Sequence, residues 1–150
     1  MCPHYWGPMN APTKISEVDP FASATERANC WRGWMVNQFA KGEMLIASAI
    51  AANGDAKIPT VLKQRVDRLR PRVEEQAQVA LDRFLDLSRH RNALAHGDGL
   101  ITIDRKGQWL LRLTLYDKDC RTSIIHYEPD AQALREEIRT ANALLKAALP

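Results

Sequence analysis

The side chains best suited to chemistry lie together in the segment SRHRNALAHG, residues 88–97. It contains Arg91, Asn92 and His96, and it follows an amphipathic stretch that predicts a helix. Residues four apart share a helical face, so Asn92 and His96 are expected to project close together beside Arg91. Arginine grips phosphate with a planar fork, histidine moves a proton to or from a ribose 2′-OH or a leaving 5′-oxygen, and asparagine orients either of them. These residue types are therefore suited to cleaving RNA.

Arg91 interrupts an apolar stripe on the expected third helix, residues 73–95. Spacings of three and four lead from Phe84 and Leu87 to Arg91 and then to Leu94. A guanidinium is rarely buried without a partner, because taking its charge out of water costs several kcal/mol. We therefore expect something anionic to meet Arg91 on this face.

Alternative assignments stay open for this segment. Arg89 precedes His96 by a six-residue gap and is an accessory candidate. Glu43 on the first helix is a second one, either as a carboxylate partner for Arg91 or as an ordinary exposed glutamate. His96 can also simply cap its own helix through backbone carbonyls, with Asn92 in support.

The first helix that must position this segment begins near residue 20, with Ser16 or Asp19 as its N-cap. Its apolar residues recur at helical spacing up to a turn at Asn53-Gly54. A helix of that length is long for the domain, so a bend is expected at Gly33 or Gly42.

The rest of the chain predicts a mainly α fold, an antiparallel helical bundle with a small antiparallel β-meander before the last helix. A second helix opens at Pro59 and ends or kinks at Pro71, and Gly97 stops the third. Strand-like alternation then covers 100–104, 109–117 and 121–128, and Pro129 and Asp130 begin the final helix.

Length and composition limit the class of protein. The chain has 150 residues, 45% hydrophobic and 26% charged, which predicts one domain over 19–150 behind an extended Pro-rich arm over 1–18. No apolar run reaches the ~20 residues of a membrane span, and the start lacks the pattern of a signal peptide. The three cysteines, odd in number and far apart, are expected to be reduced thiols. We expect a cytoplasmic protein with no metal site and no membrane contact.

The charge of the chain is unevenly distributed. The formal net charge is +3, and residues 61–91 hold eight basic residues against five acidic ones, while the remainder holds thirteen of each sign. If those basic side chains share a face, they attract phosphate. The alternative is a solvated helix surface crossed by ion pairs.

The segment RNALAHG, residues 91–97, resembles the R-x4-6-H signature of HEPN domains, with a polar residue directly after the arginine. The helical stretches around it suit the HEPN bundle, and the resemblance covers about residues 20–149. It implies a metal-independent endoribonuclease without cofactor, acting as a homodimer with both copies of Arg91 and His96 at one composite cleft. It also implies a toxin or antiphage defence component, beside an antitoxin or nucleotidyltransferase. Other HEPN domains are non-catalytic modules that bind a protein or nucleotide.

A symmetric dimer would give Arg91 a wet, anion-filled cleft. We expect the interface to combine the stripe around Leu87 with Trp31 or Trp34 of the first helix. The other histidines, His4, His90 and His126, are expected at the surface.

Overall fold

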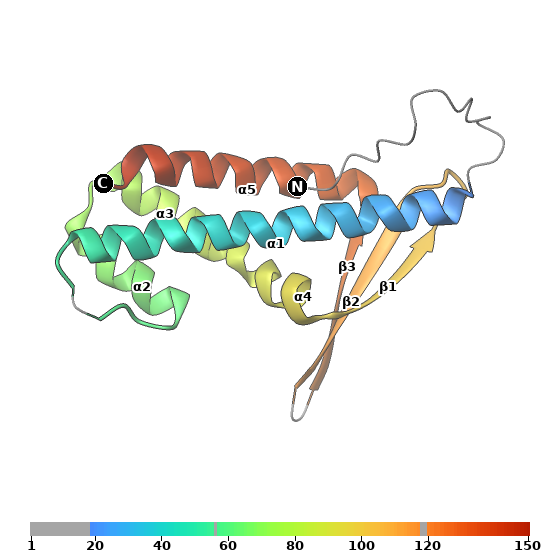
Figure 1. Cartoon of the computed structure of the whole chain (residues 1–150), viewed down its shortest axis with the longest axis horizontal. Helices are drawn as coiled ribbons and strands as arrows, with labels where there is room; N and C mark the ends of the chain where they lie inside the picture. Colours follow the sequence, from blue (N-terminus) through green and yellow to red (C-terminus); the bar gives the residue numbers. More distant parts are fainter. Residues whose placement is uncertain (1–18, 56, 118–119) are drawn as a thin grey trace, which may run out of the picture.

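A computed structural model of the chain describes residues 19–150, with gaps at 56 and 118–119. The N-terminal arm expected over 1–18 lies outside the described residues. Three long helices form the body, and a three-stranded antiparallel sheet stands at one end of it (Figure 1). The prediction of a mainly helical chain with a small antiparallel sheet before its last helix is confirmed. Within the described ranges, no helix combines the length and apolar character needed to cross a membrane.

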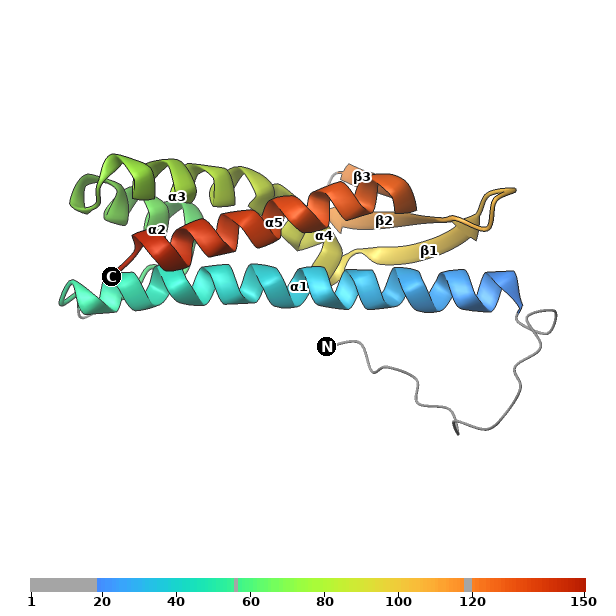
Figure 2. The same cartoon turned by 90° about the horizontal axis from the view of Figure 1, so that it is seen from above.

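Helix α1 (Pro20–Ala52) spans 33 residues and begins as its sequence predicts. The Asp19 carboxylate accepts a hydrogen bond from the Phe21 amide at 3.0 Å, which satisfies one of the amides left free at a helix start. At the other end the Asn53 side chain donates to the Ala49 carbonyl, and Gly54 turns the chain at φ +83°. The expected bend is wrong, because α1 is one continuous helix (Figure 2).

Gly42 serves close packing rather than a bend. A Cβ atom at this position would lie 2.0 Å from Cε2 of the Phe84 ring and 2.6 Å from Oδ1 of Asn142. The missing side chain therefore lets helices α3 (Glu75–Leu87) and α5 (Glu128–Ala148) approach α1 closely at this point.

The segment between α1 and the sheet is broken more often than its periodicity predicts. Helix α2 (Leu62–Leu69) passes at Pro71 into the 3-10 turn η2 (Arg70–Arg72), as expected from the proline. The single third helix expected over 73–95 is wrong: α3 ends at Leu87, and the 3-10 turn η3 (Ser88–His90) separates it from α4 (Arg91–His96).

The sheet follows α4 directly, in the order β1 (Asp98–Ile103), β2 (Trp109–Asp117), β3 (Cys120–Tyr127). Trp109, Leu111 and Leu113 alternate along one face of β2 and are buried, because that face packs on α1 and α4. The strands return the chain to the end where α1 begins (Figure 1).

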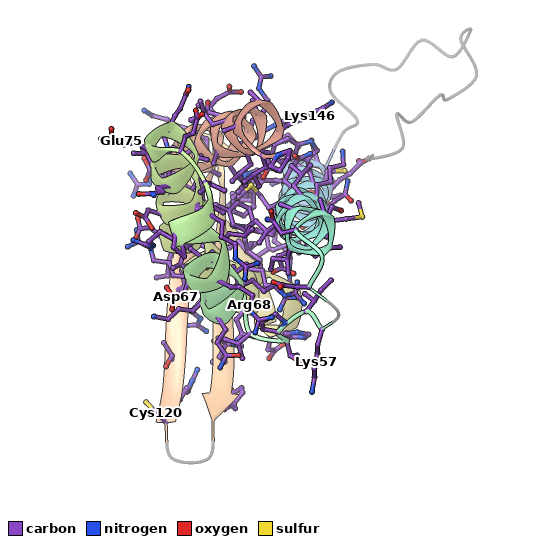
Figure 3. All side chains as sticks on the ribbon, turned by 90° about the vertical axis from the view of Figure 1, so that its left-hand side faces the viewer. Lys57, Asp67, Arg68, Glu75, Cys120 and Lys146 are labelled. Atoms are coloured by element: carbon purple, nitrogen blue, oxygen red, sulfur yellow. The ribbon has the colours of Figure 1, made fainter. Side chains whose placement is uncertain are left out.

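Helix α5 therefore runs in the same direction as α1. Three contacts show the matching order: Arg27 with Glu128, Trp31 with the Ala131 carbonyl, and the Gln38 carbonyl with Asn142. The expectation of an antiparallel bundle is wrong for α5 against α1, whereas α3 runs opposite to both of them (Figure 1). In the end view, side chains fill the space enclosed by α1, α3 and α5 (Figure 3).

The residues expected at a dimer interface lie in this core instead. Leu87 and Trp31 are each 4% exposed, and the Trp31 indole donates to the Ala131 carbonyl. Trp34 is partly buried against the same core, under the Arg135 guanidinium. The apolar stripe around Leu87, which was expected to form a dimer interface, is therefore buried within a single chain.

Two glycines of α1 test the close packing. We expect Gly42→Ala to lower the free energy of unfolding by about 1–3 kcal/mol, since the new methyl overlaps the Phe84 ring. Gly33→Ala is the matched control, because a Cβ there meets nothing within 4 Å. It should raise stability by up to about 1 kcal/mol through helix propensity. Urea denaturation measures both, and equal effects would contradict the packing role of Gly42.

Candidate functional site

The 3-10 turn η3 decides where the Arg91 side chain points. A 3-10 helix turns about 120° per residue rather than 100°, so three such residues rotate the following helix by roughly 60° relative to a continuous α-helix. Leu87 and Leu94 remain buried on either side of the turn, whereas the Arg91 side chain is 44% exposed. Arg91 therefore does not share the apolar stripe of Leu87 and Leu94, although its spacing on a continuous helix predicts that it does.

An anionic group does meet Arg91. Oε1 of Glu43 lies 3.2 Å from Nε of Arg91, and the Glu43 side chain is only 23% exposed. Of the two alternatives for Glu43, the structure shows the carboxylate partner. Because the Arg91 side chain is nearly half exposed, it remains accessible from solvent.

Helix α4 has only six residues, too few to be stable alone, and Arg32 of α1 holds its end. The Arg32 guanidinium donates from Nε to the Leu94 carbonyl at 2.7 Å and from Nη2 to the Gly97 carbonyl at 2.6 Å. It thus satisfies two carbonyls that flank His96 in sequence. Nothing in the spacing of Arg32 connects it with residue 96, so its role could not be predicted from the sequence.

His96 and Asn92 are both exposed, and neither side chain makes a hydrogen bond or ion pair with another described residue. The capping role considered for His96 has no support here, because the Arg32 guanidinium takes the Leu94 and Gly97 carbonyls. The imidazole and the amide thus face solvent with their hydrogen-bonding groups unused.

Two clefts meet at Asn92. The Arg91 cleft, about 420 Å³, lies between α1, α2 and the η3–α4 junction. The His96 cleft, about 570 Å³, lies between α4 and the β2–β3 hairpin. The first is lined by Glu43, Thr60, Arg65, Ser88, Arg91 and Asn92 among others, and the second by Asn92, His96, Asp98, Thr114, Tyr116 and Thr122 among others.

Arg89 belongs to a different part of the surface. Its Nε donates to Nε2 of His90 at 3.3 Å, and both residues line a third cleft of about 270 Å³ with His126 and Glu137. The structure thus brings Arg91, but not Arg89, to the clefts that share Asn92.

Of the two histidines at this third cleft, His126 is buried rather than at the surface as expected, and His90 is half-buried. His126 is 7% exposed, and its ring lies 4.9 Å from the Trp31 ring and 5.6 Å from the His90 ring. Burial, and to a lesser extent the charge of His90, lowers the pKa of His126 to about 4. Burial and the nearby Arg89 guanidinium also lower the pKa of His90, against the opposing effect of Glu137 and Asp86. His4 lies outside the described residues.

The basic segment 61–91 is largely neutralised by ion pairs. Arg68 and Arg72 both reach Asp55, at 3.9 and 2.9 Å. Further pairs join Lys63 to Asp67, Arg70 to Asp82, Arg89 to Asp86 and Arg91 to Glu43. For most of these side chains the ion-paired helix surface is therefore the correct alternative. Arg65 and Arg83 differ, because no carboxylate of the described residues lies within 4.0 Å of either. Arg83 is exposed on α3 and lines none of these clefts, whereas Arg65 lines the Arg91 cleft.

Comparison of the chain with models of protein families, with curated proteins and with solved structures found no match. Within the described residues, no group of three or more His, Cys, Asp or Glu is placed to hold a metal ion. A function for the chain therefore has to be argued from the chemistry of its own residues.

The buried histidine predicts how stability depends on pH. In the unfolded chain His126 takes up a proton near pH 6.5, whereas the folded chain resists this down to about pH 4. The free energy of unfolding should therefore fall as pH drops below about 6.5, by up to about 3 kcal/mol at pH 4. His126→Phe, which keeps a ring beside Trp31, should flatten this slope.

Chemical denaturation between about pH 7 and pH 5 measures the effect, because most carboxylates stay ionised across that interval. An unchanged slope in His126→Phe would show that the titration of His126 does not control stability there.

Proposed function

We propose that the chain is a metal-independent endoribonuclease of HEPN type, with Arg91, Asn92 and His96 as its catalytic residues. The observation that carries the proposal is the joint exposure of these side chains on one short helix, where two adjoining clefts share Asn92. A guanidinium, an amide and an imidazole on a single accessible ridge can contact neighbouring atoms of one RNA strand. The resemblance of RNALAHG to the HEPN signature supports the same function.

The chemistry is an internal transfer of the phosphoryl group. The ribose 2′-oxygen attacks the adjacent phosphorus, the bond from phosphorus to the 5′-oxygen breaks, and a 2′,3′-cyclic phosphate and a 5′-hydroxyl result. The 2′-OH loses one proton and the 5′-oxygen gains one, so the protons balance. His96 acts either as the general base that takes the proton from the 2′-OH or as the general acid that gives one to the 5′-oxygen. Arg91 stabilises the charge on the phosphate, and Asn92 orients the ribose or the imidazole.

Glu43 acts before the chemical step. Its carboxylate holds the Arg91 guanidinium in place while the cleft is empty, and a bound phosphate competes for the same guanidinium. An ion pair with a half-exposed arginine contributes about 0–1 kcal/mol, so a phosphate that makes charge-assisted contacts can displace it.

The second candidate is a non-catalytic HEPN-like module that binds a protein partner, such as an antitoxin. Exposed side chains on the outer face of the sheet favour it: Leu100 is 51% and Ile125 62% exposed, and both pair across the strands with Arg112. The two candidates differ in whether RNA is cleaved. They also differ on expression: an active toxin would arrest the growth of its host, whereas a protein with His96 substituted would not.

RNA cleavage in the presence of EDTA tests the catalytic assignment. We expect His96→Ala to lose about 100-fold or more in rate, as is usual when a general acid or base is removed. Arg91→Lys should also be strongly impaired, because an ammonium cannot reproduce the bidentate contact. Arg139→Lys is the matched control on α5, where an exposed arginine pairs with Glu136.

Equal activity of the wild type and His96→Ala would remove His96 from the mechanism. Absence of cleavage by the wild type on varied RNAs would favour the binding module.

The composite site predicts that activity depends on assembly. We expect sedimentation at micromolar concentration to give the mass of two chains, and the rate of cleavage per chain to fall when dilution separates them. Because Leu87 and Trp31 are buried within one chain, the two copies must meet through other residues. A protein that cleaves RNA at full rate while sedimenting as a monomer would show that one chain holds the whole site.

A further inference from the structure

Arg65 of α2 is the one basic residue that lines the Arg91 cleft besides Arg91 itself. Its Nε donates to the Pro59 carbonyl at 2.5 Å, which fixes the guanidinium against the loop before α2. The two terminal nitrogens make no hydrogen bond to another described residue. Arg65 is half-buried, so its guanidinium is held in place and yet has donors to offer.

The groups around the cleft favour a negatively charged ligand. Two guanidinium groups face a single carboxylate, that of Glu43, which already lies against Arg91. The other basic residues of 61–91 that form ion pairs have carboxylates of their own outside this cleft. The cleft thus keeps a net positive charge, while most of the other basic residues of 61–91 are paired with carboxylates.

We propose that Arg65 and Arg91 together hold one phosphate group of an RNA strand, gripping it from α2 and from α4. The proposal rests on the ribonuclease function and deepens it, because it adds a strand-binding residue outside the RNALAHG segment. Two planar guanidinium forks can satisfy several phosphate oxygens at once. The cleft adjoins the His96 cleft at Asn92, so a strand held there continues past the imidazole.

Glu43 then has an opposite effect on binding. The incoming phosphate must take Arg91 from the Glu43 carboxylate, which also repels it across the cleft. Removing that charge therefore strengthens the binding of the strand, whereas removing the Arg65 charge weakens it.

Binding of a labelled single-stranded RNA oligonucleotide to His96→Ala protein tests this without cleavage. We expect Arg65→Gln to raise Kd about 10-fold or more, the loss associated with hydrogen bonds to a charged group. The slope of log Kd against log salt should fall by about 0.7, the value for one phosphate contact on a single strand. Glu43→Gln should lower Kd, an effect that a folding defect would not produce.

Arg68→Gln is the matched control, since it removes the same charge from the same helix. Arg68 donates to the Lys57 carbonyl at 2.7 Å and lies 3.9 Å from Asp55, and it does not line the cleft. Its Kd for RNA should change less than about twofold, as expected of a charge outside the contact. Equal losses in Arg65→Gln and Arg68→Gln would overturn the site in favour of a general charge effect.

Inorganic phosphate distinguishes a free anion from a strand. If it occupies the cleft in an Arg65-dependent manner while RNA binding is independent of Arg65, the strand assignment is overturned. Arg65-dependent RNA binding in a protein that does not cleave RNA would support this site and refute the ribonuclease function. Cleavage of RNA with no effect of Arg65→Gln on binding or on rate would support the ribonuclease function and refute the Arg65 site.

Discussion

The hydrogen bonds from Arg32 to the end of α4 are the constraint on which the candidate site depends. A six-residue helix cannot hold its own shape, so the contacts to the Leu94 and Gly97 carbonyls fix α4 against α1. Two glycines make room for this arrangement. A Cβ at Gly97 would lie 2.5 Å from the Ala93 carbonyl oxygen, and one at Gly99 would lie 2.9 Å from the Arg32 guanidinium. Gly97, Gly99 and Arg32 therefore act together to hold α4 in the position that leaves His96 exposed to solvent.

The spacing of apolar residues correctly predicted the helices and strands that bury one face along their whole length. The long α1, its Asp19 cap and the alternating strands follow directly from spacing and local chemistry. Periodicity could not predict the relative direction of helices far apart in sequence. The sheet returns the chain to the start of α1, which makes α5 parallel to it, and this depends on strand length and register rather than on any residue pattern.

The position of Arg91 shows where an argument from helical spacing fails. A continuous helix from Phe84 to Leu94 would place Arg91 on the apolar stripe, facing either the core or a partner chain, whereas the Arg91 side chain is 44% exposed. The sequence SRH contains no proline or glycine that would predict the 3-10 turn, and the buried residues Leu87 and Leu94 lie on either side of it. The inference that Arg91 needs an anionic partner survives the change, because it rested on the charge of the side chain rather than on its location.

The ion pairs distinguish basic side chains whose charge is already neutralised from those that can still attract an anion. A sequence count treats every basic residue in 61–91 alike, but Asp55 alone neutralises two of them, and a paired arginine attracts a distant phosphate only weakly. Arg65 and Arg91 differ because they line one cleft with a single carboxylate between the two of them. A modest net charge of +3 is therefore compatible with a local excess of positive charge, because two arginines line one cleft with a single carboxylate between them.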